Sequence, residues 1–167
     1  MRISLKAAAA QGAETVLISG PELVMPMYTP GGAGAAPESE ALVRAFRRCD
    51  GIIIASPAYH GALSGLIKNA LDFTEELRED DRVYFEGIAI GLIVCAAGWQ
   101  AAGQTLGTLR GIAHALRGWP TPLGAALNTS TPAFDESGEC IELSTRFQLE
   151  TVGRQVVEFA KARSVPT

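Results

Sequence analysis

The most informative stretch of this chain, residues 50–73, reads DGIIIASPAYHGALSGLIKNALDF. It opens with a short apolar run, Ile52 to Ala55, of the β-branched kind that fills a buried parallel strand. Turn-forming residues follow from Ser56 to Gly61, and apolar side chains then fall at helical spacing (Leu63, Leu66, Ile67, Ala70 and Leu71). Strand, tight loop and helix form half of a βαβ unit. Open parallel sheets bind ligands outside the carboxyl ends of their strands, where this loop would lie.

The residue types in this stretch resemble those of a known family. The pattern S-P-x-Y-x-G at residues 56–61 is followed in register by G-x-x-K-N-A-L-D at residues 65–72. This combination resembles the NADPH-dependent FMN reductase family, which includes flavin, quinone, azo-dye and chromate reductases. The resemblance implies a flavodoxin-like three-layer α/β sandwich with a parallel sheet. It also implies FMN as the cofactor, with NADPH or NADH as the electron donor.

The rest of the chain carries alternating helix and strand signals. We predict strands over 15–18, 52–55, 88–96 and 123–128, and helices over 4–11, 38–48, after Gly103 and after a capping-box pattern at Thr145 and Gln148. Three prolines and three glycines predict a loop over 24–37, in which residues 25–30 resemble the L-P-x-Y segment of the family. Residues 75–82 are predicted to be a solvated helix end and turn. The alternation predicts one α/β domain over residues 1–167.

One element of the family pattern is missing from the sequence. In the family, a first strand runs into a phosphate-binding loop that reads roughly G-S-x-R-x-x-S, and no G-S-x-R occurs here. The residues before Leu5 cannot form a strand. We therefore expect the first strand to be missing from between the strands at 15–18 and 52–55, and the natural polypeptide to begin upstream of Met1. Such loops bind phosphate through backbone N–H groups at a helix N-terminus.

Two loops are the candidate flavin contacts that the resemblance implies. The loop after the third strand of the family supports the flavin ring chiefly through backbone groups, and the matching residues are Pro57, Ala58, Tyr59, His60 and Gly61. The loop 97–103, represented by Ala97, Gly98 and Trp99, would meet the pyrimidine side of the ring. His60 has three possible roles: it hydrogen-bonds toward the flavin, it titrates near neutrality, or it faces solvent without a role. Trp99 either forms one side of the flavin site or lies in a subunit interface. No catalytic side chain is expected, because the flavin carries the chemistry.

Composition narrows the possible partners and the compartment. Asp and Glu outnumber Lys and Arg by 18 to 14 and no basic run occurs, which argues against a nucleic-acid partner. No stretch is long and apolar enough to span a bilayer, so no membrane partner is expected. The three cysteines lack metal-ligand spacing, so no metal is expected, and they favour a reducing compartment, with the cytoplasm as the default. We expect Cys95 to be a buried free thiol and Cys140 to lie in a polar loop.

The sequence predicts an FMN-dependent NAD(P)H oxidoreductase that passes hydride from a nicotinamide to FMN and on to a small acceptor, such as free flavin or a quinone. Two other functions stay open: a flavodoxin-like electron carrier, and a flavin-free scaffold or dimerisation module. Lys68 and Asp72 lie four residues apart on the K-N-A-L-D helix. In the family this helix commonly packs against its twin, so the resemblance implies a homodimer or homotetramer.

Overall fold

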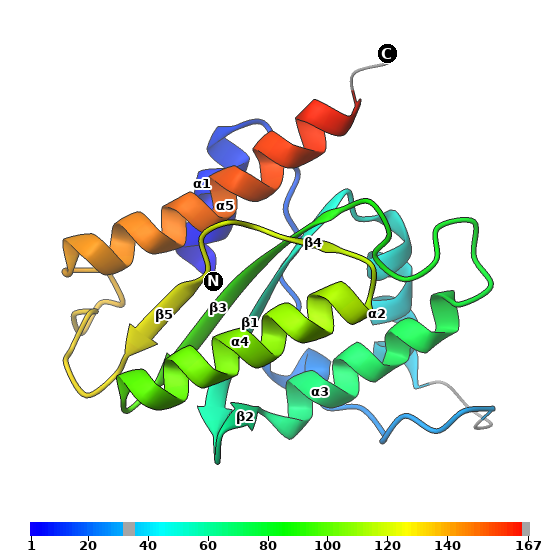
Figure 1. Ribbon diagram of the computed structural model, residues 1–167, viewed down its shortest axis with the longest axis horizontal. Coiled ribbons are helices and arrows are strands. Elements are labelled where there is room, and N and C mark those ends of the chain that lie inside the picture. The colour runs from blue at the N-terminus through cyan, green and yellow to red at the C-terminus, as the bar shows by residue number, and fades with distance from the viewer. Residues whose placement is uncertain (32–35, 165–167) are drawn as a thin grey trace.

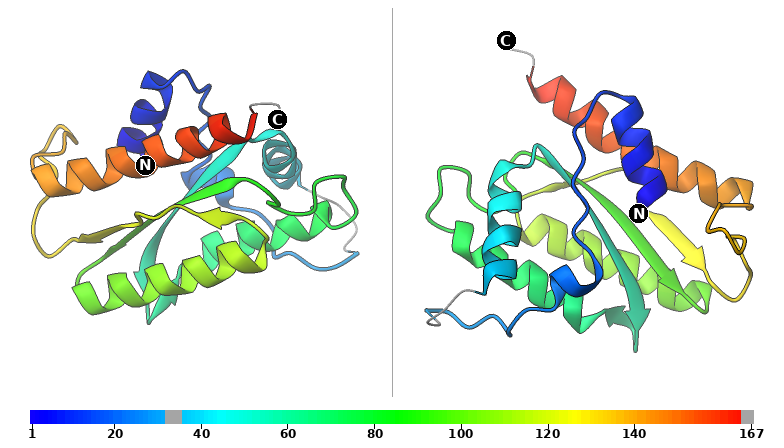
Figure 2. Two further views of the ribbon diagram at one scale, coloured as in Figure 1. Left: turned by 45° about the horizontal axis from the view of Figure 1, so that its top comes forward. Right: turned by 180° about the vertical axis from the view of Figure 1, so that it is seen from behind.

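The computed structural model describes residues 1–31 and 36–164, and these form three layers (Figures 1 and 2). The helices α1 (Arg2–Ala10) and α5 (Leu143–Ser164) pack against each other on one face of a central sheet. The helices α3 (Gly65–Asp72) and α4 (Trp99–Ala115) cover the opposite face. The predicted α/β sandwich around a mostly parallel sheet is therefore confirmed.

The sheet is built around β3 (Ala89–Ala96), which is buried along almost its whole length. On one side β3 runs parallel to β1 (Gly51–Tyr59), in a register that extends from the pair Gly51–Ala89 to the pair Pro57–Cys95. On its other side β3 pairs in parallel with β4 (Trp119–Pro120) near its start and with β5 (Ala125–Asn128) near its end. Parallel pairing brings the carboxyl ends of β1, β3 and β5 to one edge of the sheet.

The outer edge of β1 is only partly covered. Ala58 and Tyr59 pair with the short antiparallel strand β2 (Ala62–Leu63), and from Gly51 to Pro57 no strand of the described residues pairs with this edge. The predicted strand over 15–18 is wrong: residues 13–19 form neither helix nor strand, and Val16 is 70% exposed. Apolar β-branched residues form a strand only where a neighbour accepts their backbone hydrogen bonds. Among the described residues, no strand lies beside residues 15–18 to accept them.

The other predicted elements are confirmed, with shifted ends. The predicted helices over 4–11 and 38–48 are α1 and α2 (Pro37–Arg48), and the last strand is shortened to β5. Residues 75–82 are the end of a 3₁₀ helix, η2 (Phe73–Leu77), and a turn; a second 3₁₀ helix, η1 (Gly20–Leu23), interrupts the region before the loop that begins at Val24. Of the predicted loop 24–37, residues 32–35 lie outside the described residues.

The start of α5 differs from the predicted capping box. The Glu142 carboxylate accepts the backbone N–H groups of Ser144 and Thr145, so Glu142 caps the helix. Gln148 points elsewhere, and its Oε1 accepts the N–H of Ala126 on the edge strand β5 at 3.3 Å. The prediction placed the cap three residues too late, because it required a hydroxyl residue at the first position of the motif.

Two apolar clusters fill the space on either side of the sheet. The larger cluster includes Phe46 and Phe85, whose rings meet edge to face with centroids 5.1 Å apart. The smaller cluster lies between the sheet and α5 and includes Leu149 and Val152. Cys95 is a free thiol as predicted, but it is half-buried and not buried. Cys140 lies outside the helices and strands, as a loop residue should, although its side chain is buried. Among the helices of the described residues, none has the length and apolarity needed to cross a membrane.

Candidate functional site

The turn-forming segment predicted over 56–61 is a β-hairpin, in which most of these residues still belong to β1. β1 continues through Pro57 and Ala58 to Tyr59, which pairs with Ala62 of β2. Only His60 and Gly61 connect the two strands, and both have positive φ, at 51° and 88°. Two central residues with positive φ are the signature of a tight type I′ hairpin turn. The turn therefore holds Tyr59 and His60 at a fixed position on the edge of the sheet.

Two hydroxyl groups connect this hairpin to the start of α3. The Ser56 Oγ accepts the backbone N–H of Ser64 at 2.9 Å, and Ser56 is buried. The Ser64 Oγ in turn accepts the N–H of Ile67 at 3.2 Å, which makes Ser64 the N-cap of α3. The first serine of S-P-x-Y-x-G is thus a structural residue, because it fixes the end of β1 to the helix that follows.

The second predicted loop is shorter than expected and lies beside the hairpin. Only Ala97 and Gly98 separate β3 from α4, which begins at Trp99, so residues 99–103 are helical and not a loop. The pairing of Pro57 with Cys95 places the ends of β1 and β3 next to each other. The hairpin also touches α4, because a Cβ on Gly61 would lie 3.2 Å from the Nε2 of Gln104. The two sequence-predicted segments therefore form one site.

The N-terminal end of α4 points into this site (Figure 1). The N-cap residue Gly98 provides no side-chain hydrogen bond, and no described residue accepts the N–H groups of the first helical turn. A Cβ on Gly98 would meet no atom within 4 Å, so the surrounding space is open. Free N–H groups and the helix dipole together favour negative charge at this end of α4.

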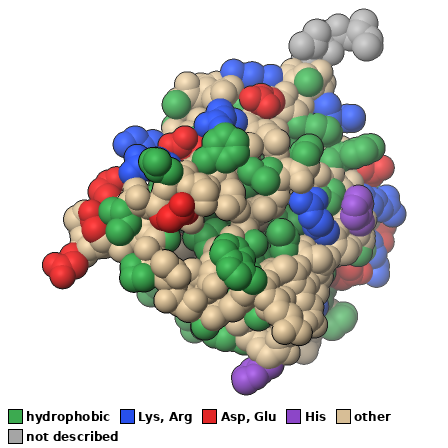
Figure 3. Space-filling view, turned by 60° about the vertical axis from the view of Figure 1, so that its left-hand side comes forward, with side chains coloured by type: hydrophobic (Ala, Val, Ile, Leu, Met, Phe, Trp, Pro, Cys, Tyr) green, Lys and Arg blue, Asp and Glu red, His purple; other side chains and the backbone are tan. Residues whose placement is uncertain are grey.

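The eight predicted contact residues differ in exposure. Pro57, Ala58, Gly61 and Gly98 are half-buried, whereas His60 and Ala97 are exposed. The two aromatic side chains are largely exposed, Tyr59 at 61% and Trp99 at 63%. Figure 3 views the molecule from this side; hydrophobic and uncharged side chains occupy the lower central part of the face, and most charged ones lie around it. The site is thus an uncharged surface with exposed aromatic rings, which suits a planar ring better than an ion.

A second helix N-terminus lies near the end of β3. Met1, the residue directly before α1, is half-buried, and its nitrogen lies within electrostatic range of the Cys95 thiol. The residues present therefore fit the ring of a flavin at the ends of β1 and β3, with the N-termini of α1 and α4 at the same edge of the sheet.

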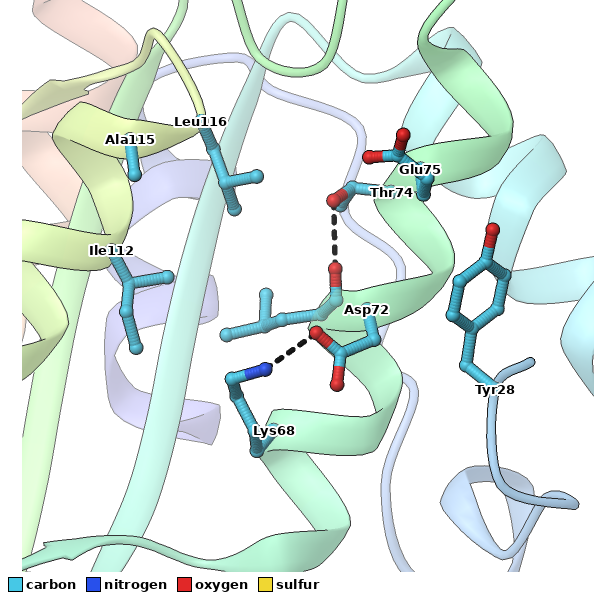
Figure 4. Close-up of a pocket in the computed structure, with 9 residues that line it drawn as sticks. Tyr28, Lys68, Asp72, Thr74, Glu75, Ile112, Ala115 and Leu116 are labelled. Atoms are coloured by element: carbon cyan, nitrogen blue, oxygen red, sulfur yellow. Dashed lines mark hydrogen bonds and ion pairs between the residues drawn. The ribbon is translucent and has the colours of Figure 1, made fainter. Parts of the chain in front are cut away.

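A pocket of about 420 Å³ lies elsewhere, between α3, η2 and the C-terminal half of α4 (Figure 4). Apolar side chains of α4, such as Ile112 and Leu116, face Lys68, Asp72 and Glu75 across it. The Nζ of Lys68 and a carboxylate oxygen of Asp72 form an ion pair at 2.5 Å, as their spacing predicts. None of the eight predicted flavin contacts lines this pocket. It is a feature of the outer face of α3 and α4.

The sequence singled out two segments that the structure brings together, but it missed three residues that organise them. Ser64 has a recognisable signal, because a serine directly before an apolar helical pattern is a common N-cap. Asn69 has a sequence signal only as part of the K-N-A-L-D motif. In the structure its side chain donates a hydrogen bond to the carbonyl of Pro26 at 3.1 Å and so holds the 25–30 segment. Gln104 gives no sequence signal, because a glutamine on a helix is usually a solvated residue.

Comparison with known proteins identifies relatives of this chain. Residues 1–131 match the profile of the NADPH-dependent FMN reductase family. The chain is 36% identical over 100 residues to an FMN-dependent NADPH-azoreductase of Staphylococcus aureus (strain USA300). That match covers 60% of this chain and 50% of the relative, so the chain matches only half the length of this curated relative.

Solved structures of low sequence identity share the fold. The flavoenzyme NAD(P)H:acceptor oxidoreductase FerB from Paracoccus denitrificans superposes with a TM-score of 0.76 at 18% identity, over 96% of this chain and 87% of FerB. A WrbA-like flavodoxin from Agrobacterium tumefaciens superposes with a TM-score of 0.61 at 19% identity, over 96% of this chain and 89% of the other. The fold is therefore flavodoxin-like.

Proposed function

Because the chain belongs to the NADPH-dependent FMN reductase family, we propose that it is an FMN-dependent NAD(P)H oxidoreductase. Its electron acceptor would be a small molecule such as free flavin, a quinone or an azo compound. The observation that carries the proposal is the pairing of Pro57 with Cys95, which places the hairpin after β1 beside the free N-terminus of α4. This is the carboxyl edge of a parallel sheet, where such folds bind their ligands.

Different residues of the site would contact different sides of the flavin ring. The backbone of residues 57–61 offers N–H and C=O groups along one side of the ring, and the hairpin turn keeps them rigid. The N-terminus of α4 lies on the other side, where its N–H groups favour the negative charge of a reduced flavin. Tyr59 and Trp99 are exposed aromatic residues that can pack against a ring or exclude water from it.

When bound, FMN would supply the redox chemistry: two electrons and one proton would arrive as hydride from NADPH, and two electrons would leave for the acceptor with that proton and a second one from water. The protein needs no acid, base or nucleophile for this reaction. Its part is to bind the ring, to orient the two substrates against it and to tune its potential through the dipole of α4.

We also propose that the protein works as a homodimer in the cytoplasm. The free thiols of Cys49, Cys95 and Cys140 suit a reducing compartment. The dimer would form through the outer faces of α3 and α4, where the pocket of Figure 4 leaves apolar side chains uncovered and a second copy could fill it. Size-exclusion chromatography with light scattering would measure the mass; a monomer at all micromolar concentrations would contradict the dimer.

Binding and turnover of the purified chain test the proposed enzyme. Titration of FMN with the protein should quench the flavin fluorescence, and NADPH with a quinone should then be consumed at a rate proportional to bound FMN. Riboflavin is the matched control, because it has the ring without the phosphate. Rapid mixing with NADPH separates the enzyme from a simple electron carrier, which would bind FMN without accepting hydride. Failure to bind any flavin would leave the scaffold function as the better description.

A further inference from the structure

The turn between β1 and β2 needs support from outside its own backbone. His60 has a φ of 51°, in the left-handed region that a residue with a side chain rarely adopts. Gly61 follows at 88°, a conformation that glycine tolerates. A two-residue turn at a sheet edge that is otherwise unpaired has few contacts of its own. Whatever packs against it therefore determines how firmly Tyr59 and His60 are held.

The contact comes from Gln104 of α4. The three heavy atoms nearest to a Cβ placed on Gly61 all belong to the Gln104 side chain: Nε2 at 3.2 Å, Cδ at 3.8 Å and Oε1 at 4.0 Å. The amide of Gln104 therefore lies against the turn in the space that the missing Gly61 side chain leaves free. A methyl group on residue 61 would crowd the amide nitrogen, and the Gln104 side chain would have to shift by a few tenths of an ångström.

The Gln104 amide has no other partner among the described residues. The backbone carbonyl of Gln104 accepts a hydrogen bond from the Thr108 hydroxyl, but no hydrogen bond to the side chain forms within the described part of the chain. Gln104 is exposed, and its amide approaches the turn at Gly61 without a hydrogen bond, so any effect on the turn acts through van der Waals packing. Gln104 belongs to the same helix whose first turn borders the second half of the site, so it joins the two halves into one unit.

We propose that Gln104 is a positioning residue: its side chain holds the His60–Gly61 turn in the conformation that the flavin site requires. The role of Gln104 in the flavin site rests on the proposed function, whereas its effect on the turn does not. Gln104 is not a catalytic residue, because it acts through the turn. Nothing in the reaction itself requires an amide at this position.

Amide hydrogen exchange of the flavin-free protein tests the first part. Gln104→Ala should speed exchange of the Gly61 and Ala62 N–H groups several-fold, with the global unfolding midpoint unchanged. Gln104→Met keeps the length of the side chain and should restore slow exchange at the turn. His114→Leu changes another exposed side chain of α4 and should leave the turn unaffected. Equal exchange in the wild type and the alanine variant, or a methionine variant as fast as the alanine variant, would overturn the proposal.

FMN titration of the same variants tests the second part. Gln104→Ala should weaken FMN binding by about three- to tenfold, the range expected for the loss of one net contact, and Gln104→Met should recover it. A double-mutant cycle with Gly61→Ala should be non-additive, because the new methyl group meets the Gln104 amide only when that amide is present. Additive effects would overturn the contact. A wild type that binds no FMN would refute the proposed function, while the exchange experiment would still decide the role of Gln104.

Discussion

The backbone N–H of Tyr28 donates a hydrogen bond to the Oδ1 of Asn69, at 2.8 Å. The amide nitrogen of the same Asn69 donates to the carbonyl of Pro26, at 3.1 Å. One buried side chain thus satisfies a donor and an acceptor two residues apart on the 25–30 segment, as a neighbouring strand would. Because Asn69 belongs to the helix α3, its side chain holds the 25–30 segment in place beside that helix.

Replacing Asn69 by Leu should therefore destabilise the protein by about 2–4 kcal/mol, because two backbone groups lose their partner in a side chain that is only 4% exposed. Urea unfolding measures the change. Asn69→Asp keeps the acceptor for Tyr28, but it removes the donor to Pro26 and buries a carboxylate, so at neutral pH it should be at least as destabilised as the leucine variant. A leucine variant as stable as the wild type would show that the 25–30 segment is held by other contacts.

The sequence could predict Asn69 only as part of a motif, and the same limit applies to the rest of the fold. Helices with a clear apolar face, such as α2, and the strongly apolar β3 were predictable, because their signals are local and their burial is high. The strand predicted over 15–18 failed because strand formation depends on a neighbour, which no local pattern reports. The tight turn could have been predicted from the sequence, because His60-Gly61 occupies the two central positions at which Asn-Gly is favoured in two-residue hairpins.

For the candidate site, the sequence predicted that the two segments lie at one edge of the sheet, but it did not predict their contact. That residues 57–61 and 97–99 lie together follows from the rule that parallel strands end at a common edge. That α4 begins as early as Trp99 was missed, although Ala101 and Ala102 are strong helix formers. The contact between Gly61 and Gln104 could not be predicted, because it depends on the distance between a helix and a hairpin.

The close crossing of α1 and α5 gives a second prediction. A Cβ on Gly153 would lie 2.1 Å from the carbonyl oxygen of Ser4, so Gly153→Ala must push α1 away from α5. We expect a loss of about 1–3 kcal/mol in unfolding free energy, and faster proteolysis within α1. Gly107→Ala on α4 is the matched control, because a Cβ there meets no atom within 4 Å. That variant should gain roughly 0.4–1 kcal/mol; a similar gain for Gly153→Ala would contradict the tight crossing.

The cap of α5 gives a prediction about pH. Hydrogen bonds from Thr145 and Ser144 lower the pKa of the Glu142 carboxyl from its ordinary value of 4.5 to about 2. A carboxylate whose pKa is lower in the folded protein stabilises it above pH 4.5, and this contribution is lost as the pH falls from 4.5 through 2. The stability difference between the wild type and Glu142→Gln should therefore shrink over that range. Thermal unfolding at a series of pH values measures it, and a constant difference would show that the charge of Glu142 does not matter.

The open edge of β1 gives the last prediction, which concerns individual backbone amides. In a β-strand, successive N–H groups point to opposite sides. Among the strands that the structure describes, β3 alone is a continuous parallel partner of β1. Between Ile52 and Ala55, alternate amides should therefore exchange with solvent quickly, while those that face β3 exchange slowly. Residues 93–96 of β3 are the internal control, because β3 lies between β1 on one side and β5 on the other. The backbone amides of all four residues should exchange slowly. Uniformly slow exchange along β1 would mean that a further strand covers its edge, and if that strand came from a second copy, the protection would rise with protein concentration.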